Sequence, residues 1–521
     1  MVKMKLAVAT PRIYLADVEK NYSQAVEMLD KAVQQGARMI VFPPHFLTGA
    51  TCGVLSSQEL LASAEKNAFE DLQKMASEKG VEVVSESCST VDMEIMCVSV
   101  LEMVTRYRKV KEQLAVKSAA ERKAYVYCPS GYGESSAEGV YAGGSLVYCN
   151  GRLLAAGERF SREGTMVFAE IDTSAEPANV PRLQDESEES ATLRRHPFVP
   201  DDPEELGARC DDILQIQTTG LVSRMEFINA KSAVIGISGG LDSTLALLVT
   251  CLAFDTLDIP RQNIIAVTMP GLGTSKRTKG NALALMEALG VTSREISIVA
   301  AVEQHFKDIG HDPSNRNVTY ENAQARERTQ ILMDLANDYG AFVVGTGDLS
   351  EIALGWCTFN GDHISNYGVN CGVPKTLMRE IVRHAAMTRF EVCKDVLLDI
   401  VDTPVSPELV PGNDGEIGQK TEEVIGPYEL HDFFLYHFVR RGKTPRQIFR
   451  DAWQAFYYQY DEETLKACLR TFIRRFFGQQ FKRSCSPEGP CVGSVSLSPR
   501  SSWPMPSDAF SSLWLSELDK I

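Results

Sequence analysis

A glycine-rich string in the middle of the chain constrains the fold more than any other feature of the sequence. It reads Gly-Ile-Ser-Gly-Gly-Leu-Asp-Ser over residues 236–243 and lies between apolar stretches at 233–237 and 244–254. These stretches predict a buried strand followed by a helix. Adjacent glycines let backbone N–H groups close around a phosphate, and a helix N-terminus favours an anion. The string therefore predicts a phosphate-binding turn whose Asp242 is suited to hold Mg²⁺ on phosphate oxygens.

The alternative interpretation of this string is an ordinary strand-to-helix turn with Ser or Asp as the N-cap residue. Two glycines alone would favour that ordinary turn. The complete string of two hydroxyls, paired glycines and a carboxylate favours the phosphate site instead.

Length and composition limit the classes of protein to which the chain can belong. The 521 residues suffice for about two to four domains. No run of apolar residues is long enough for a membrane span, and the N-terminus does not resemble a signal peptide. The net charge of −16 disfavours nucleic-acid binding by the whole surface. The 13 cysteines contain no C-x₂-C pair, which disfavours a structural zinc site and favours a reducing cytoplasm.

The N-terminal third alternates between strand-like and helix-like patterns and predicts an α/β layered domain over residues 1–171. The expected strands are 6–10, 38–43, 81–85, 125–127, 145–148 and 166–171, and the expected helices are 18–35 and 60–79. The segment 172–206 is rich in Pro, Glu, Asp and Ser and is interpreted as a linker or an extended arm.

The second half also alternates strand and helix, in an order typical of a doubly wound parallel sheet. The expected strands are 233–237, 263–268, 295–299 and 342–345, and the expected helices include 277–289 and 322–339. Ligands bind such sheets at the carboxyl ends of the strands. The loops after residues 237, 268 and 345 are therefore expected at one edge, where they would form a single site.

Several strings in this half resemble a known family. Residues 236–243 match neither a Walker A loop nor a dinucleotide fingerprint, but resemble the SGG-x-DS loop of the ATP pyrophosphatases, which cleave ATP between the α and β phosphates. Residues 268–278, 318–332 and 345–356 resemble NAD synthetases, and residues 480–508 resemble the closing segment of their long, glutamine-dependent type. The resemblance implies an adenine nucleotide alpha hydrolase-like domain over residues 207–508, followed by a tail at 509–521.

The resemblance also implies an activity. ATP would adenylate the nicotinate carboxylate of deamido-NAD⁺, and ammonia would then displace AMP to give NAD⁺, with pyrophosphate as the other product. The cofactors implied are ATP and Mg²⁺, and the substrates are deamido-NAD⁺ and ammonia or glutamine. A cytoplasmic homo-oligomer with a dimeric synthetase core, binding neither nucleic acid nor membrane, is expected.

Carried onto this sequence, the family pattern assigns roles to individual residues, with Asp242 and Lys375 expected to be catalytic. The ATP-binding residues would be Gly236, Ser238, Gly239, Gly240, Leu241, Asp242, Ser243, Thr346 and Lys375. The Mg²⁺ ligands would be Asp242 and Glu351. The residues contacting deamido-NAD⁺ would be Asn322, Arg326, Glu351, Trp356, Asp362 and Lys482. The Pro- and Gly-rich segment 402–418 is interpreted as a lid or specificity loop.

Several of these residues also have an ordinary structural interpretation. Arg326 and Arg328 lie on a charged helix, where pairing at the solvated surface is the default. Glu351 fits an ordinary carboxylate near a helix N-terminus. Trp356 fits a core position, and Lys375 follows Pro374 at an expected helix start.

Residues 1–171 resemble the nitrilase-like glutaminase domain of the long NAD synthetases, here as a truncated α/β sandwich. The matching strings are 41–43, 47–53, 124–127, 133–135 and 150–154. Such domains use a Glu base, a Lys and a Cys nucleophile. Pro44 stands at the Glu position, the Lys segment is missing between Gly80 and Val81, and Val84 or Ser85 stands at the Cys position.

The altered triad predicts that the domain does not hydrolyse glutamine, so that nitrogen comes from free ammonia or from a partner protein. Cys88 is close to the Cys position but off register, and is interpreted as a structural cysteine. The tail departs from the family pattern as well, with Cys491, Ser502 and Pro504 where Lys, Asp and Arg are usual. These changes are expected to affect substrate binding.

Three alternatives remain open at this stage. Glutamine-dependent activity could be retained, the chain could be a tRNA-thiolating ligase of the same superfamily, or it could be a non-catalytic nucleotide-binding scaffold. A thiolating ligase needs a catalytic Cys pair and a basic RNA-binding face, which the absence of C-x₂-C and the acidic balance disfavour. The intact glycine string, Asp242, Glu351 and Lys375 argue against a scaffold.

Overall fold

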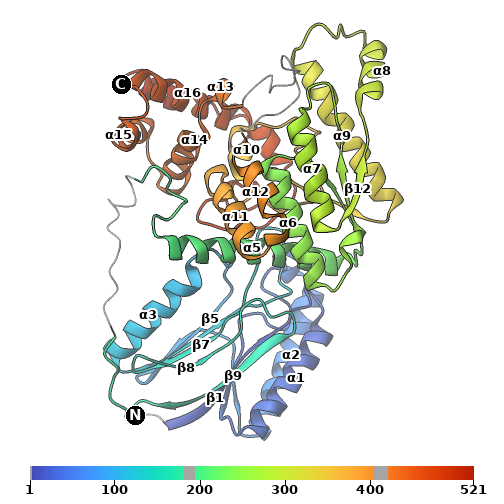
Figure 1. Cartoon of the computed structure of the whole chain (residues 1–521). Coiled ribbons are helices and arrows are strands. Elements are labelled where there is room, and N and C mark those ends of the chain that lie inside the picture. Colours follow the sequence, from blue (N-terminus) through green and yellow to red (C-terminus); the bar gives the residue numbers. More distant parts are fainter. Residues whose placement is uncertain (1–2, 181–193, 404–420) are drawn as a thin grey trace. The chain divides into compact units, whose positions relative to one another are not determined.

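The chain forms two compact units, residues 1–185 and 186–521, each with its own core (Figure 1). This computed structural model describes residues 3–180, 194–403 and 421–521. Within that part of the chain, no helix is both long and apolar enough to cross a membrane.

The first unit is built on two sheets. One sheet has the strand order β3-β2-β1-β9, with β1 to β3 parallel and β9 antiparallel to β1. Its strands are β1 (Lys3–Pro11), β2 (Met39–Val41), β3 (Glu82–Val84) and β9 (Gly164–Asp172). The second sheet has the order β4-β5-β6-β7-β8. Its strands are β4 (Cys88–Ser89), β5 (Met93–Val98), β6 (Ala124–Pro129), β7 (Leu146–Cys149) and β8 (Arg152–Ala156).

Alternating side chains along the strands make these sheets the inner layers of a sandwich. In β6, Ala124 and Val126 pack into the core between the sheets, whereas Tyr125 and Tyr127 pack against the helix α3 (Arg106–Glu121). The helices α1 (Val18–Gln34) and α2 (Glu59–Glu78) cover the outer face of the first sheet. The predicted α/β sandwich is confirmed.

The turn between β7 and β8 follows from its sequence. Asn150 and Gly151 have φ angles of 49° and 79°, the left-handed values that a two-residue hairpin turn requires at both positions. Asn and Gly tolerate these angles better than other residues. The predicted Asn-Gly turn is therefore present.

The second unit contains one five-stranded parallel sheet with the order β12-β11-β10-β13-β14. Its strands are β10 (Ala233–Gly236), β11 (Ile264–Thr268), β12 (Thr292–Glu295), β13 (Phe342–Gly345) and β14 (Tyr367–Gly368). Because β10 pairs in parallel with both β11 and β13, the loops that follow these three strands leave the sheet at the same edge. The predicted shared edge and doubly wound fold are confirmed.

Helices pack on both faces of this sheet. The helix α6 (Leu241–Thr256) is buried almost throughout, which explains why its sequence is apolar on every side. The helices α8 (Val299–Ile309) and α9 (Val318–Asp338) pack against β10, β11 and β13 through a core that includes Val234, Val267 and Phe306. The remaining helices of this half are α5 (Pro203–Phe227) and α7 (Lys276–Leu289).

The C-terminal part is helical. Its helices are α10 (Leu349–Leu354), α11 (Lys375–Thr388), α12 (Lys394–Val401), α13 (Thr421–Ile425), α14 (Tyr428–Leu435), α15 (Pro445–Phe456), α16 (Glu462–Gly478), α17 (Gln480–Ser484) and α18 (Ser512–Leu518). Edge-on and tilted contacts among Phe433, Phe434, Phe472 and Phe476 join α14 to α16. This packing holds α14 beside α10 and α11, where it reaches the candidate site.

Several expected boundaries differ from the structure; for example, α9 begins at Val318 rather than at residue 322, and α5 begins within the expected linker. The strand expected at 295–299 is wrong: β12 ends at Glu295, and Val299 already begins α8. This edge strand exposes most of its side chains, whereas the apolar Ile296 and Ile298 follow it and pack into the helical core. The helix expected from Thr244 begins at Leu241 instead, which brings Asp242 and Ser243 into its first turn.

Candidate active site

The glycine loop connects β10 to α6 and is tied together by its own hydroxyl groups. The Ser238 Oγ accepts a hydrogen bond from the Gly240 N–H at 3.1 Å and lies 3.1 Å from the Ser243 Oγ. Ser243 also donates to the Gly240 carbonyl at 3.2 Å. The two serines therefore hold the turn closed and leave its backbone in a fixed conformation.

Gly239 is the position in this loop that only glycine fits. Its φ angle of +84° is left-handed, and an added Cβ would lie 2.0 Å from the Thr278 carbonyl oxygen. Gly240 precedes α6 as its N-cap residue and has no side chain with which to cap the first turn. The first N–H groups of α6 are thus available to an anion, where the helix dipole also favours negative charge.

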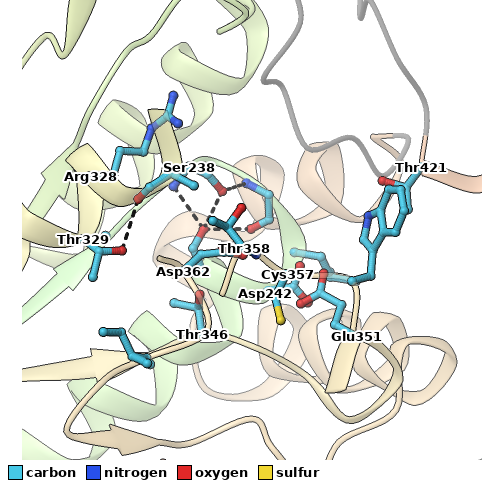
Figure 2. A pocket seen from close by; sticks show the side chains of 18 of the residues that line it. Ser238, Asp242, Arg328, Thr329, Thr346, Glu351, Cys357, Thr358, Asp362 and Thr421 are labelled. Carbon is cyan, nitrogen blue, oxygen red and sulfur yellow. Dashed lines mark hydrogen bonds between the residues drawn. The ribbon is translucent and has the colours of Figure 1, made fainter. Parts of the chain in front are cut away.

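A cavity of about 690 Å³ opens at this edge of the sheet (Figure 2). Its wall includes most of the predicted ATP-binding residues, namely Gly236, Ser238, Gly240, Leu241, Asp242, Ser243 and Thr346. Gly239 and Lys375 are not among its lining residues. The cavity also reaches Asn322, Glu351, Trp356, Asp362 and Lys482, so the loop after β10, α9 and the chain after α10 share one space.

Behind the wall, Lys375 is the centre of a cluster of three carboxylates. Its Nζ lies 2.6 Å from the Asp242 Oδ1, 2.6 Å from the Asp348 Oδ2 and 3.1 Å from the Glu351 Oε1. Lys375 begins α11, as the sequence predicts, and its side chain is only 2% exposed. Asp242 and Glu351 keep 23% and 20% exposure toward the cavity. The lysine therefore compensates part of this negative charge from the protein side.

Lys375, Asp242, Asp348 and Glu351 form a carboxylate–lysine cluster, in which burial and crowding shift the pKa values of Lys375, Asp348 and Glu351. Burial, with the nearby Asp242 charge adding to it, raises the pKa of Glu351 to about 7 although Lys375 opposes the rise. Burial also raises the pKa of Asp348 well above its usual range. Burial alone would lower the pKa of Lys375, but the three carboxylates outweigh it and raise that pKa. The cluster contains three acidic groups and one basic group, so it is suited to bind a further cation.

Two residues that the sequence analysis did not single out complete this part of the site. Asp348 caps α10, since its Oδ1 accepts from the Glu351 N–H at 2.7 Å. The buried Asn370 Nδ2 donates to the Asp242 carbonyl at 2.9 Å and to the Thr346 carbonyl at 3.1 Å. Asn370 thus joins the start of α6 to the loop after β13. A signal for Asp348 existed, because it directly follows Thr346-Gly347 at the predicted sheet edge.

With one exception, the residues predicted to contact deamido-NAD⁺ line the part of the cavity that is formed by α9, by α10 and by the chain after α10. The Asn322 Oδ1 accepts from the Thr358 Oγ1 at 2.9 Å, and the Asp362 Oδ1 accepts from the Thr358 N–H at 2.8 Å. The Trp356 ring stacks under the Arg475 guanidinium at 4.9 Å. The Lys482 Nζ donates to the carbonyls of Gly355 and Cys357 at 2.8 and 2.6 Å, which fixes the chain around Trp356.

Arg326 is the exception. Its side chain is exposed, its Nε donates to the Phe359 carbonyl at 3.2 Å, and it does not line the cavity. Arg328 lines the cavity instead, where its Nε donates to the Met269 carbonyl at 3.1 Å. Helical spacing explains the difference, because Ala325, Arg328 and Thr329 lie on the face of α9 that Asn322 shares.

The altered tail residues are not part of the cavity wall. Cys491 is buried and its Sγ donates to the Gly493 carbonyl at 3.2 Å. Ser502 is exposed and donates to the Ser496 Oγ at 2.8 Å, and Pro504 is also exposed. None of the three lines the cavity. The expected lid at 402–418 lies outside the described residues apart from its first two positions.

In the first unit, two of the positions assigned to the amidase triad lie at or just after the ends of neighbouring strands. Val41 of β2 pairs with Val84 of β3, so Pro44 and Ser85 follow the ends of parallel strands. Val84 packs against the sandwich core, and Cys88 is exposed. The Cys52 Sγ donates to the Thr48 carbonyl at 3.1 Å, and burial raises the pKa of its thiol.

The buried carboxylate in this region, Glu134, is fully occupied by hydrogen bonds. It accepts from the Ala50 N–H at 2.8 Å, from the Thr51 N–H at 3.0 Å and from the Thr51 Oγ1 at 2.5 Å. These bonds connect Glu134 to the loop after Thr48 and hold that loop in place.

Two protein-family models match the chain. The model described as NAD synthase matches residues 213–471, which contain the glycine loop and the carboxylate–lysine cluster. The model described as carbon-nitrogen hydrolase matches residues 5–89 of the first unit.

Curated relatives match over most of the chain. The glutamine-dependent NAD(+) synthetase of Mycobacterium leprae is 37% identical over 472 residues, which cover 80% of this chain and 69% of the relative. The protein of the same description from Mycobacterium tuberculosis is 36% identical over 471 residues, with the same coverage.

Solved structures share the fold. A glutamine-dependent NAD(+) synthetase from Cytophaga hutchinsonii has a TM-score of 0.78 at 15% identity, covering 99% of this chain and 100% of that one. A glutamine-dependent NAD+ synthetase from Acinetobacter baumannii, in complex with adenosine diphosphate, has a TM-score of 0.61 at 17% identity and covers 95% and 97%. At these identities the likeness concerns the fold alone.

The geometry of Gly239 leads to a testable prediction. Gly239→Ala should displace the loop, because the new Cβ must move the Thr278 backbone and a left-handed Ala itself costs about 1–2 kcal/mol. We expect the affinity for ATP, measured by calorimetry, to fall at least about tenfold, which is about 1.4 kcal/mol.

Gly280→Ala is the matched control for this change. Gly280 lies on α7, two residues from Thr278, with no atom within 4 Å of an added Cβ. Ala at this helical position should leave ATP affinity unchanged and stabilise the fold slightly. Equal ATP affinity in both variants would contradict the account of the loop.

Proposed function

The chain belongs to the glutamine-dependent NAD(+) synthetases, and from that membership we propose that residues 207–508 convert deamido-NAD⁺ to NAD⁺ with ATP. One observation carries the proposal. The glycine loop with Asp242, the carboxylate of Glu351 and the side chain of Asn322 come from three parts of the chain and line one cavity of about 690 Å³, together with Trp356 and Lys482.

The ATP phosphates would lie against the glycine loop. The N–H groups at the start of α6 and the hydroxyls of Ser238 and Ser243 point to an anion of this kind. The Lys375 ammonium group is paired with three carboxylates in this structure. Its positive charge would therefore attract the phosphates from behind Asp242 and Glu351, without direct contact. Thr346 extends the same wall from the end of β13.

Asp242 and Glu351 fit a magnesium ion by the chemistry of their donor atoms. Ligand oxygens of Asp242, Asp348 and Glu351 lie within 4.8 Å of one another, and Mg²⁺ takes a few carboxylate oxygens while keeping other positions for phosphate and water. When bound, Mg²⁺ supplies charge neutralisation on the departing pyrophosphate. Asp242 and Glu351 would hold it, since both face the cavity, whereas Asp348 is buried behind them.

The reaction would proceed in two steps. A carboxylate oxygen of the nicotinate attacks the α-phosphorus of ATP. A new oxygen–phosphorus bond forms, the bond from the α-phosphorus to the oxygen bridging to the β-phosphorus breaks, and pyrophosphate leaves. Ammonia then attacks the acyl carbon, AMP leaves, and one proton is released. Asn322, Trp356, Asp362 and Lys482 are proposed to orient deamido-NAD⁺, and Arg326 stays a weaker proposal because it does not line the cavity. Exclusion of water by the cavity wall would protect the adenylate from hydrolysis.

We further propose that the nitrilase-like domain at residues 1–171, within the first unit, no longer hydrolyses glutamine, so that ammonia arrives free or from a separate protein. Pro44 cannot accept a proton, and Val84 and Ser85 offer no thiol where the family pattern has one. The match to the carbon-nitrogen hydrolase model covers only residues 5–89 of this unit. The raised pKa of Cys52 opposes its use as a substitute nucleophile.

The nitrogen source is the direct test of this proposal. With deamido-NAD⁺, ATP and Mg²⁺, the purified chain should release AMP when ammonium is supplied and should not when glutamine is supplied. The glutamine reaction is run with an ammonia-consuming dehydrogenase, so that contaminating ammonia cannot contribute. AMP release with glutamine under scavenging would refute the loss of the glutaminase, and no AMP release with ammonium would refute the synthetase itself.

A substitution at the carboxylate wall tests the role of Asp242. Asp242→Ala removes one proposed magnesium ligand and one partner of Lys375, and should reduce AMP formation by more than about 100-fold. Asp255→Ala is the matched control, because Asp255 lies near the end of the same helix and pairs with Arg261 at 2.6 Å. Both variants should keep wild-type circular dichroism. Near-normal turnover in Asp242→Ala would exclude the proposed role.

A further inference from the structure

The proposed chemistry depends on the separation of Glu351 and Lys375, which belong to different helices. Glu351 lies on α10, a helix of six residues, and Lys375 is the first residue of α11. A helix as short as α10 is not stable by itself and takes its position from its contacts. Something outside these two helices must therefore fix the 3.1 Å between the Lys375 Nζ and the Glu351 Oε1.

A single buried carboxylate on α14 connects the starts of both helices. The Asp432 Oδ1 accepts a hydrogen bond from the Ser350 Oγ. The Asp432 Oδ2 accepts from the Thr376 N–H at 2.9 Å and from the Thr376 Oγ1 at 2.7 Å. Ser350 directly precedes Glu351, and Thr376 directly follows Lys375. Asp432 thus holds the chain neighbours of both functional residues.

Two further contacts tighten this connection. The Ser350 Oγ accepts from the Lys375 N–H at 2.9 Å, so Ser350 joins α10, α11 and α14 at one point. Four residues before Asp432, the Tyr428 ring lies 5.2 Å from the Lys375 Nζ, in the range of a cation–π contact. The helix α14 therefore contacts the Lys375 ammonium group directly and reaches the Lys375 backbone through Ser350.

The burial of Asp432 shows that this carboxylate is used for its hydrogen bonds. It is 0% exposed, and a buried carboxylate is costly unless it is hydrogen-bonded. Both oxygens are occupied, and the negative charge lies at the N-terminal turn of α11, where the helix dipole favours it. A hydrogen bond to an ionised acceptor is also stronger and more directional than one to a neutral group.

We propose that Asp432 is a positioning residue, whose buried carboxylate locks the first turns of α10 and α11 and so sets the positions in which Glu351 and Lys375 meet bound ATP. The inference rests on the proposed function and adds a residue that lines neither the cavity nor the glycine loop. Displacements of about 1 Å remote from the reacting atoms can cost about 100-fold in rate. Loss of the Asp432 carboxylate should therefore reduce turnover more than it reduces the stability of the fold.

The test compares Asp432→Asn with Asp451→Asn in the full chain. Asp451 is 3% exposed, lies on α15 of the same helical region and pairs with Lys443 at 2.6 Å, without contact to α10 or α11. Asp432→Asn should stay folded, lose at least about tenfold in kcat for AMP formation and raise KM for ATP by a smaller factor. Asp451→Asn should lower the thermal midpoint at least as much while keeping wild-type kcat.

A second measurement does not depend on turnover. Magnesium with an ATP analogue bridged by methylene between the α and β phosphates should raise the thermal midpoint of the wild type and of Asp451→Asn. It should raise that of Asp432→Asn less, because Glu351 and Lys375 are no longer held. Ser350→Ala and Thr376→Val should each cause part of the loss in kcat. When either is combined with Asp432→Asn, the further loss in kcat should be smaller than the loss that the same substitution causes in the wild type.

Wild-type kcat with a wild-type response to the analogue in Asp432→Asn would overturn the inference. Full additivity of Ser350→Ala and Thr376→Val with Asp432→Asn would overturn it as well. If Asp432→Asn does not fold, the Ser350→Ala/Thr376→Val double variant replaces it, and wild-type kcat in that variant would equally overturn the inference. Absence of AMP formation in the wild type would refute the proposed function instead, and the response to the analogue would still test the inference.

Discussion

The ion cluster around Lys375 is the interaction on which the rest of the site depends. One ammonium that is almost inaccessible to solvent faces Asp242, Asp348 and Glu351, which come from the starts of α6 and α10. Charges this deeply buried persist only when they are paired and hydrogen-bonded. Since these partners belong to two strand-to-helix connections of one parallel sheet, the pairing brings those connections together. The cavity wall is a consequence of this convergence.

The two units retain different parts of their family patterns. In the second unit, the glycine loop, the carboxylates and the cavity are present together, and each has a distinct proposed role in holding a nucleotide. In the first unit, the sandwich core and the loop held by Glu134 are intact, while Pro44, Val84 and Ser85 occupy the strand ends. Core packing and site chemistry rest on different residues, so the proposed loss of glutamine hydrolysis is compatible with an intact sandwich.

The sequence predicted those features that local patterns encode. The apolar run at 233–237, the glycine string and the Asn150-Gly151 turn have local signatures, and each was found. Polar edge strands lack such a signature, which explains the error at β12, whose side chains are mostly exposed. The contacts of Asp432 with Ser350 and of Lys375 with Asp242 join residues that are 82 and 133 positions apart. A single sequence does not reveal such pairs, so the family resemblance assigned Lys375 to the phosphates, whereas its carboxylate partners became evident only in the fold.

The central claim is that this site transfers the AMP moiety of ATP to a carboxylate. Exchange of labelled pyrophosphate into ATP, measured without ammonia, tests it most directly, because exchange requires a reversible adenylate. The account predicts exchange that depends on both deamido-NAD⁺ and Mg²⁺ and is lost in Lys375→Met. Exchange that proceeds without deamido-NAD⁺, or that survives unchanged in Lys375→Met, would contradict the account.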